Sequence, residues 1–232
     1  MIIGIAGRKR VGKNFVAEVI AGVLKRDQDV KLVAFADPIK KFCNEILGID
    51  KEYLWGDGDK NTMTQYSWDF LPLDCRSVAR PGFSGRVVYP GFSGFDPHGS
   101  LTGACKSGFM TVREIMQVVG TELGRNIWGK NIWIDAMERQ IKDRSGPNPA
   151  ANVVDSWIIT DVRMINEAQA VHKWGGTMIR VDGIPREGNG SVDQHETETK
   201  IDSLEVDAII DNGPGMTKEG IEEQARKILK WE

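Results

Sequence analysis

A chain of 232 residues with 41% hydrophobic and 27% charged residues has the composition of an ordinary globular protein that buries a proper core. A net charge of -3 argues against broad coating of nucleic acid, because no basic excess is present to neutralise a phosphate backbone. No apolar run approaches membrane-spanning length, and the widely spaced Cys43, Cys75 and Cys105 form neither a metal motif nor a disulfide framework. We therefore expect a cytoplasmic protein whose partners are small molecules, without nucleic acid or membrane.

The first 24 residues predict a strand, a glycine-rich loop and a helix, in that order. Residues 2–6 are an apolar run of buried-strand length, and apolar residues recur at helical spacing over residues 15–24. The loop at residues 7–13 reads Gly-Arg-Lys-Arg-Val-Gly-Lys, which is the G-x-x-x-x-G-K pattern of a phosphate-binding P-loop. The alternative is an ordinary strand-to-helix turn with a surface lysine, and both flanking elements argue against it.

The predicted P-loop implies a site for the phosphates of ATP. Its two glycines allow backbone N–H groups to turn toward a phosphate, and the following helix adds its positive end. The usual pattern continues with Ser or Thr to hold Mg²⁺, whereas here Asn14 follows the lysine. Either the Asn14 side-chain oxygen binds the metal, or water and the nucleotide hold it alone. The predicted ATP-binding residues are Gly7, Arg10, Val11, Gly12, Lys13 and Asn14.

A second strand is expected over residues 30–36, followed by a helix that stops near Gly48. Asp37 is a favoured N-cap, and Pro38 fits the first helical position. The end of this strand faces the same edge of the sheet as the P-loop, which is where open α/β sheets bind ligands.

Residues of about 50–108 differ in composition from the rest and predict an insertion with a hairpin. The pentapeptide Pro-Gly-Phe-Ser-Gly occurs at residues 81–85 and again at 90–94, with a short strand expected between the two copies. Long loops of this kind are usually functional. Aromatic residues here either cover a substrate or pack as a satellite cluster; they include Trp55, Tyr66, Trp68 and Phe70.

A strong helix is predicted from Thr111 to Asn126, and a second helix over residues 131–144. The first has a buried apolar stripe and, beside it, a polar stripe at i, i+4 and i+8 formed by Arg113, Gln117 and Thr121, with Gly120 adjacent. Because Gly120 has no side chain, a ligand can come close to the helix beside these hydrogen-bond donors. A solvated face with a helix-weakening glycine is the alternative.

The remaining chain alternates strands and helices. Strands are expected at residues 153–160, 177–181 and 207–211, with helices at 166–174 and near the end. This pattern predicts an α/β fold with a doubly wound, mostly parallel sheet, helices on both faces and a long Gly/Pro/aromatic-rich insertion. We expect one domain over residues 1–232, with a lid loop at about 182–198.

Three residues in this half suit phosphoryl transfer. Asp161 ends a strand at the ligand edge, where a carboxylate either orients hydrated Mg²⁺ or accepts a proton; capping the next helix is its alternative role. Arg163 is a candidate phosphate clamp, because a guanidinium binds phosphate with two hydrogen bonds. Arg186, in a glycine-flanked loop, either closes over the transferring phosphate or is simply solvated.

Taken in order, these pieces resemble the bacteriophage deoxynucleoside monophosphate kinases, a branch of the P-loop nucleoside monophosphate kinases. The resemblance spans both ends of the chain and leaves mainly residues 50–108 unmatched. The family loop often continues Gly-Lys-Asp-Thr, whereas this chain has Gly-Lys-Asn-Phe. The matching segments are residues 7–13, 36–40, 111–123, Trp133, 161–163 with Glu167, 175–177, and His195 with Thr197 and Glu198.

The resemblance implies transfer of the ATP γ-phosphoryl group to a deoxynucleoside monophosphate, with ATP and Mg²⁺ as cofactors. Because Asn14 replaces the usual hydroxyl residue, we expect Asp161 to hold the metal through water. The predicted catalytic residues are Lys13, Asp161, Arg163 and Arg186. The alternatives are a P-loop kinase for another small metabolite, resembling dephospho-coenzyme A kinase, and a non-catalytic nucleotide-binding module. A homodimer is one compatible assembly. The implied acceptor-site residues are Asp37, Lys40, Arg113, Gln117, Gly120, Thr121 and Trp133.

Overall fold

The computed structural model describes residues 1–25, 29–68, 108–143, 156–184 and 201–230. They form two compact units, each described by itself below. The first unit consists of residues 1–38 and 128–232, and the second of residues 39–127. The predicted lid loop, with Arg186, and the repeated pentapeptide lie outside the described residues.

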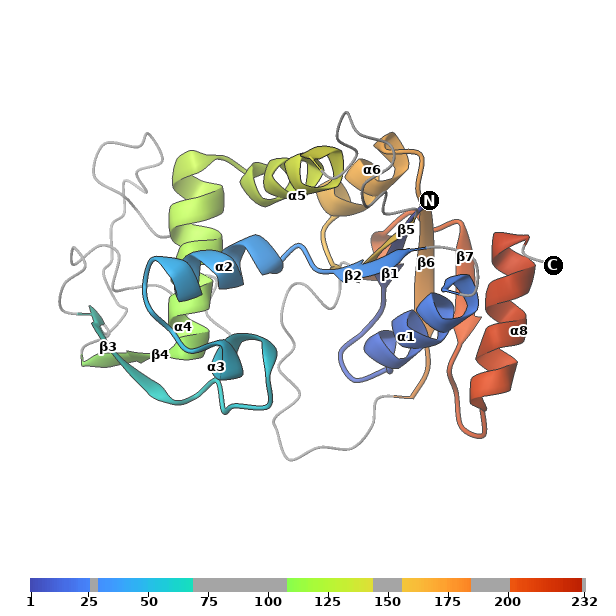
Figure 1. The fold of residues 1–232 in the computed structure, drawn as a ribbon, viewed down its shortest axis with the longest axis horizontal. Coiled ribbons are helices and arrows are strands. Elements are labelled where there is room, and N and C mark those ends of the chain that lie inside the picture. The colour runs from blue at the N-terminus through green and yellow to red at the C-terminus, as the bar shows by residue number, and fades with distance from the viewer. Residues whose placement is uncertain (26–28, 69–107, 144–155, 185–200, 231–232) are drawn as a thin grey trace, which may run out of the picture. The chain divides into compact units, whose positions relative to one another are not determined.

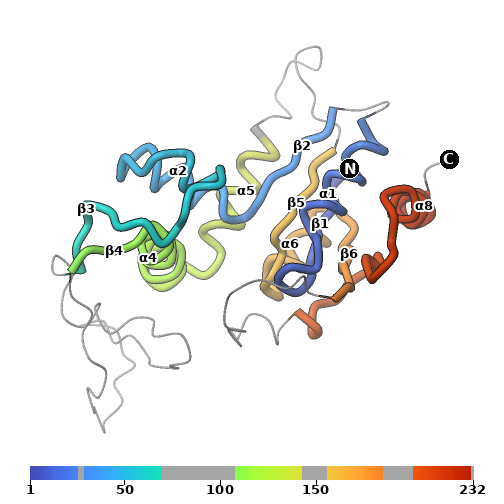
Figure 2. The backbone as a smooth tube through the Cα atoms, turned by 90° about the horizontal axis from the view of Figure 1, so that it is seen from below, coloured from blue at the N-terminus to red at the C-terminus, as the bar shows by residue number. Residues whose placement is uncertain are grey.

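The first unit is built on a five-stranded parallel sheet in the order β2-β5-β1-β6-β7 (Figures 1 and 2). Every predicted strand of this part of the chain is present, so the predicted α/β fold with a parallel sheet is confirmed. The strands are β1 (Ile2–Ala6), β2 (Val30–Val33), β5 (Ser156–Val162), β6 (Thr177–Asp182) and β7 (Ala208–Asp211).

Helices cover both faces of this sheet, because successive side chains of a strand point to opposite faces. In β1, Ile3 and Ile5 pack in a core with helices α1 (Lys13–Leu24) and α8 (Lys218–Leu229). Ala6 lies in a separate core with helices α5 (Ile132–Asp143) and α6 (Ile165–Lys173). The central strand is therefore buried on both sides, as its continuous apolar run predicts.

Parallel strands place all their carboxyl ends at one edge of the sheet. The register sets Ala6, the last residue of β1, opposite Val162 of β5 and Arg180 of β6. The loop that leaves β1 therefore starts between two neighbouring strand ends, at the edge where such sheets bind ligands.

The second unit is helical with a small two-stranded sheet. Strand β3 (Met63–Ser67), within the predicted insertion, pairs antiparallel with β4 (Phe109–Thr111), which directly follows the insertion. The short strand predicted between the two pentapeptides lies outside the described residues. The other elements of this unit are α3 (Lys51–Trp55), α4 (Val112–Gln117) and most of α2 (Asp37–Glu45), which begins in the first unit.

The predicted helix from Thr111 is confirmed in position but not in type. Thr111 and Glu114 form a capping box that starts α4, and from Val118 to Trp128 the chain continues as a π-helix. Nothing in the hydrophobic pattern distinguishes a π-helix from an α-helix, so sequence could not predict this change. Such π segments frequently lie at functional sites.

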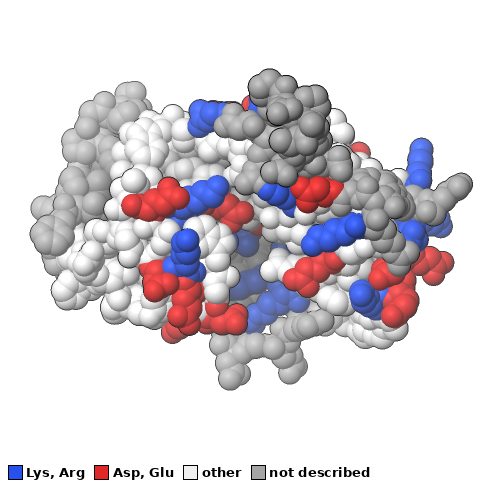
Figure 3. Space-filling view, viewed as in Figure 1, with Lys and Arg blue, Asp and Glu red and all other residues white. Residues whose placement is uncertain are grey.

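On the face drawn in Figure 3, Lys and Arg side chains are interspersed with Asp and Glu side chains. This mixture agrees with the small net charge of -3. Within the described ranges, no helix combines the length and apolar character needed to cross a bilayer.

Two glycines offer a test of this packing. At Gly176, which follows α6, an added Cβ would lie 2.9 Å from the Ile2 carbonyl oxygen and 2.8 Å from Val171 Cγ1. Because a backbone oxygen cannot move aside, we expect Gly176→Ala to lower the free energy of unfolding by about 1–3 kcal/mol. Gly22, in α1, has nothing within 4 Å of such a Cβ, so Gly22→Ala should raise the free energy of unfolding by about 0.5–1 kcal/mol. Urea unfolding followed by circular dichroism would measure both; a neutral Gly176→Ala would contradict this packing.

Candidate functional site

The loop between β1 and α1 has the backbone conformation of an anion-binding turn. Gly7, Arg10 and Gly12 have positive φ angles of 153°, 67° and 85°. Gly12 is the N-cap of α1, where no side chain makes a capping hydrogen bond and the first turn holds no acidic residue. The backbone N–H groups and the positive dipole end of α1 are therefore suited to a bound anion.

The Lys13 side chain folds over this same loop. Its Nζ donates hydrogen bonds to the carbonyl oxygens of Gly7, at 2.8 Å, and of Arg8, at 2.7 Å. The ammonium is thus held at the loop whose backbone suits phosphate, which is the position predicted for it. Asn14, next in the chain, is exposed and therefore open to solvent ligands.

Sequence reasoning missed Asn212, which braces the loop from the end of β7. Its Nδ2 donates to the carbonyl oxygen of Val11 at 2.8 Å, and a Cβ added at Gly12 would collide with the same side chain. The two residues are separated by some 200 positions, and the only signal in the sequence is an amide residue directly after an apolar strand. Gly12 therefore needs to be glycine for two reasons, its left-handed backbone and its neighbour.

A pocket of about 260 Å³ adjoins the loop on this side. It combines side chains of the loop with the turn that follows β7, so it is continuous with the phosphate-binding backbone. The residues that line it are Arg10, Val11, Ile184, Asn212, Gly213, Pro214, Gly215 and Met216.

Asp161 fastens the end of β5 to the chain that leaves β2. Its carboxylate accepts hydrogen bonds from the backbone N–H of Phe35, at 2.6 Å, and of Ala36, at 3.1 Å. Burial raises the pKa of this carboxyl group, while these two hydrogen bonds and the charge of Arg163 act in the opposite direction.

The alternative role of Asp161, capping the next helix, is wrong. Glu167 takes that role: its Oε2 accepts hydrogen bonds from the backbone N–H of Arg163, at 2.9 Å, and of Met164, at 3.1 Å, ahead of α6. Glu167 is only 4% exposed, so the helix start is fixed from within the core. The hydrogen bonds of Asp161 instead go to the segment after β2, at the edge of the sheet.

Asp37 is not the N-cap that the sequence suggests. It is the first residue of α2, and its Oδ2 accepts a hydrogen bond from the backbone N–H of Ala34, at 2.7 Å, on the strand side of the junction. Its negative charge contributes to the raised pKa of Asp161, so the two carboxylates lie within electrostatic reach of each other. In the described part of the chain, no group of three or more His, Cys, Asp or Glu residues could hold a metal.

Four residues predicted for the acceptor lie together in the second unit. Arg113, Gln117 and Thr121 are all exposed, so their side chains face outward from the α4 and π-helical segment. The Lys40 Nζ lies 5.8 Å from the centre of the Trp55 ring, within cation–π range.

Besides Asp37, two further predicted acceptor residues have packing roles. Gly120 is buried, and a Cβ there would lie 3.0 Å from Ile39 Cδ1, which gives a structural reason for glycine. Trp133 is 7% exposed and belongs to α5 in the first unit. Of the insertion aromatics, Trp68 is buried and the Tyr66 hydroxyl donates to the Leu47 carbonyl, so these two side chains have structural partners.

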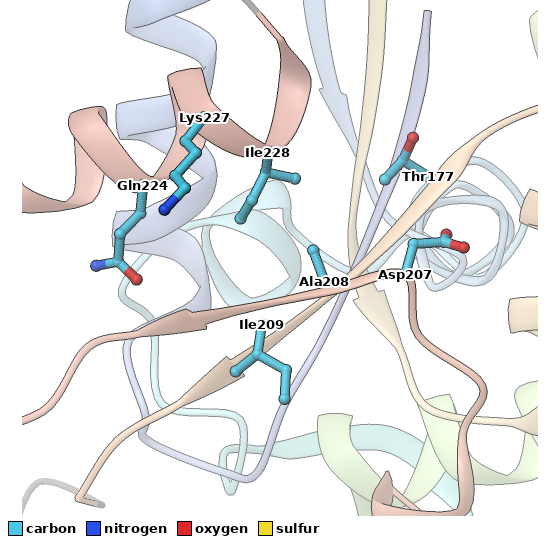
Figure 4. Close-up of a pocket in the computed structure, with 7 residues that line it drawn as sticks. All are labelled: Thr177, Asp207, Ala208, Ile209, Gln224, Lys227 and Ile228. Atoms are coloured by element: carbon cyan, nitrogen blue, oxygen red, sulfur yellow. The ribbon is translucent and has the colours of Figure 1, made fainter.

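A second pocket of the first unit, about 470 Å³, lies elsewhere (Figure 4). Thr177 and Ala208 begin β6 and β7, so this pocket is at the amino end of the strands, opposite the P-loop. Side chains of α8, including Gln224 and Ile228, form its other wall. It is therefore separate from the phosphate-binding chemistry.

A P-loop at the carboxyl edge of a doubly wound parallel sheet, with a lysine folded over it, defines a nucleotide-binding α/β protein of the P-loop kinase type. The chain belongs to the deoxynucleotide monophosphate kinase family, whose model matches residues 101–220, just over half of its length. The predicted family is thus confirmed.

Individual relatives carry the similarity beyond that segment. A putative deoxynucleotide monophosphate kinase of Acanthamoeba polyphaga mimivirus is 26% identical over 211 residues, which are 88% of this chain and 83% of the relative. The deoxynucleoside-5'-monophosphate kinase of Escherichia phage T5 is 26% identical over 193 residues, 75% of this chain and 72% of its own. The deoxynucleotide monophosphate kinase of Escherichia phage RB69 is 28% identical over 120 residues, covering 52% and 45%.

The raised pKa of Asp161 predicts a specific pH dependence of stability. A carboxyl group with a higher pKa in the folded state binds its proton more tightly there than in the unfolded chain, where the pKa is about 3.9. Its contribution to stability therefore increases as the pH falls through the raised folded pKa toward that value. The free energy of unfolding of the wild type minus that of Asp161→Asn should increase as the pH is lowered from neutral toward the unfolded-state pKa of about 3.9. Urea titrations at several pH values would measure it, and a difference that decreases toward acid would contradict the raised pKa.

Proposed function

We propose that this protein transfers the γ-phosphoryl group of ATP to a deoxynucleoside 5'-monophosphate. An oxygen of the acceptor phosphate attacks the γ-phosphorus, the bond to the β–γ bridging oxygen breaks, and the products are the deoxynucleoside diphosphate and ADP. The observation that carries the proposal is the Lys13 ammonium held over an uncapped helix start at the ligand edge, in a chain of this family.

The donor nucleotide is assigned to the first unit. Its β- and γ-phosphates lie on the backbone N–H groups of the loop, and Lys13 exchanges its two carbonyl partners for phosphate oxygens. The adjoining pocket of about 260 Å³ receives the nucleoside part, since Arg10 and Val11 border both the loop and the pocket.

The acceptor phosphate is assigned to Arg113, with Gln117 and Thr121 on the same exposed face. A guanidinium binds a phosphate monoester through two parallel hydrogen bonds and discriminates against uncharged nucleosides. Arg163 at the sheet edge and Arg186 in the loop after β6 remain proposed clamps for the transferring group. Asp37, Lys40, Gly120 and Trp133 remain proposed acceptor-site residues.

Mg²⁺ is a proposed cofactor that neutralises phosphate charge when it is bound. The donor set fits an ion held chiefly by the nucleotide and water, because the carboxylates of Asp161 and Asp37 at this edge already accept backbone hydrogen bonds. Asp161 orients the water shell in this proposal, and Asn14 replaces the hydroxyl of the usual loop.

The two alternatives are less well supported. A kinase for another small metabolite would share the P-loop, but family membership favours a deoxynucleotide acceptor. A non-catalytic binding module has no use for a second set of phosphate-binding side chains such as Arg113 and Lys40.

A coupled assay of ADP release, run with ATP, Mg²⁺ and a panel of deoxy- and ribonucleoside monophosphates, tests the function directly. We expect activity with at least one deoxynucleoside monophosphate, and a loss of kcat of about 100-fold or more in Lys13→Ala. The variant should keep its fold, because the Lys13 ammonium bonds to carbonyls of its own loop. Absence of activity across the panel, or a folded Lys13→Ala with normal rates, would contradict the proposal.

The metal assignment predicts opposite outcomes at two positions. Asp161→Asn should lower kcat steeply, because the carboxylate that orients the water shell loses its charge. Asn14→Ser should be tolerated, because a small hydroxyl at this position suits a direct ligand. Initial rates over a Mg²⁺ titration at saturating ATP would compare the two, with circular dichroism as the control for folding. If Asp161→Asn kept the full rate, the carboxylate would have only its structural role at the sheet edge and no role in binding the metal.

A further inference from the structure

The second unit gathers three cations, of which Lys40 and Arg113 belong to the proposed acceptor site and Lys60 has no role in it so far. Lys40 lies on α2, Arg113 on α4, and Lys60 in the turn that precedes β3. Sequence analysis singled out Lys40 and Arg113, but gave no role to Lys60. The three come from separate segments of the chain, so only the folded unit brings them into electrostatic reach of one another.

The turn that carries Lys60 is fastened to the start of α4. The Asp59 carbonyl accepts from the Thr62 N–H at 3.0 Å, which closes the turn. The Arg113 N–H donates to the Lys60 carbonyl at 2.9 Å, and the Arg113 Nε donates to Asn61 Oδ1 at 3.5 Å. Lys60 and Arg113 are thus held next to each other by backbone contacts that do not depend on their charges.

Within the described part of the chain, the Lys60 ammonium has no anionic partner. The side chain is half-buried, and the charges that act on it are those of Lys40 and Arg113, both positive. Burial and these two cations lower the pKa of Lys60. Among the residues for which the structure gives positions, none makes an ion pair or hydrogen bond with its Nζ. Gathering like charges in a partly desolvated place costs free energy unless an anion binds there.

We propose that Lys60, with Lys40 and Arg113, binds the phosphate of the acceptor deoxynucleoside monophosphate. This inference rests on the proposed function and adds a residue to its acceptor site. A phosphate monoester carries close to two negative charges and three terminal oxygens, which matches three cationic donors converging from separate segments. Arg113 supplies a planar fork, while Lys40 and Lys60 supply compact charges that the anion brings together without repulsion.

A matched set of lysine variants tests the role of Lys60. Lys60→Met keeps the length of the side chain and removes the charge, and we expect the KM for the preferred deoxynucleoside monophosphate to rise about tenfold or more. The KM for ATP should stay within about twofold, since the P-loop belongs to the other unit. Lys51→Met, an exposed lysine of α3 that does not act on Lys60, makes the same charge change and should leave both constants unaltered. Lys60→Arg should restore most of the acceptor affinity.

Calorimetry separates a phosphate contact from a structural role. In Lys60→Met, the affinity for the monophosphate should fall by about the same factor as the KM rises. The corresponding deoxynucleoside, which has no phosphate, should bind the wild type and the variant with equal affinity. An unchanged monophosphate affinity in a folded Lys60→Met would overturn the inference while leaving the kinase proposal intact. Equal losses for nucleoside and monophosphate would also overturn it. If the wild type bound the monophosphate through Lys60 but released no ADP, the inference would stand and the proposed function would fail; if the wild type bound no monophosphate, both would fail.

Discussion

The site depends on one backbone constraint, which is the left-handed turn that ends the P-loop at Gly12. Only there can the chain leave a buried central strand and enter α1 with its first N–H groups directed at the sheet edge. Asn212 then closes on the loop from the far end of the sequence and occupies the space where a side chain of residue 12 would lie. The last strand of the sheet therefore stabilises the loop that follows the first, and the integrity of the donor site is a property of the whole parallel sheet.

Two carboxylates near the end of β5 accept backbone hydrogen bonds from two different segments of the chain. Glu167 is buried and satisfies backbone donors ahead of α6, whereas Asp161 satisfies donors of the segment after β2. Because Glu167 fixes the helix, Asp161 does not need to, and its charge can serve the ligand edge. The raised pKa of Asp161 shows that burial outweighs the hydrogen bonds it accepts, so a nearby cation would stabilise the ionised form.

Sequence could predict the features that depend on local pattern. The strand–loop–helix start, the parallel sheet and most helix positions follow from apolar periodicity and glycine placement, which neighbouring residues determine. Features set by tertiary contacts could not be predicted from the sequence. Asn212 contacts the loop from the other end of the chain, and Gly120 leaves room for the Ile39 side chain that packs against it. The π-helix from Val118 also escaped, because its apolar pattern is that of an ordinary helix. Asp37 is the first residue of α2 rather than its N-cap, and its carboxylate accepts a hydrogen bond from the Ala34 N–H upstream.

The two lysines assigned to phosphate differ in what an anion must displace. Lys13 already donates to two loop carbonyls, so a nucleotide exchanges those hydrogen bonds for new ones, and the net gain comes from the charge and the helix dipole. Among the described residues, Lys60 has cations as its electrostatic neighbours and no ion pair or hydrogen bond of its ammonium, so a phosphate bound there would replace repulsion by attraction. In the proposed acceptor site, part of the driving force for binding therefore resides in the unliganded protein itself, where backbone contacts hold Lys60 next to Arg113 and the charge of Lys40 acts on Lys60 as well. Removing one of them should weaken phosphate binding and, at the same time, relieve the repulsion between the other two.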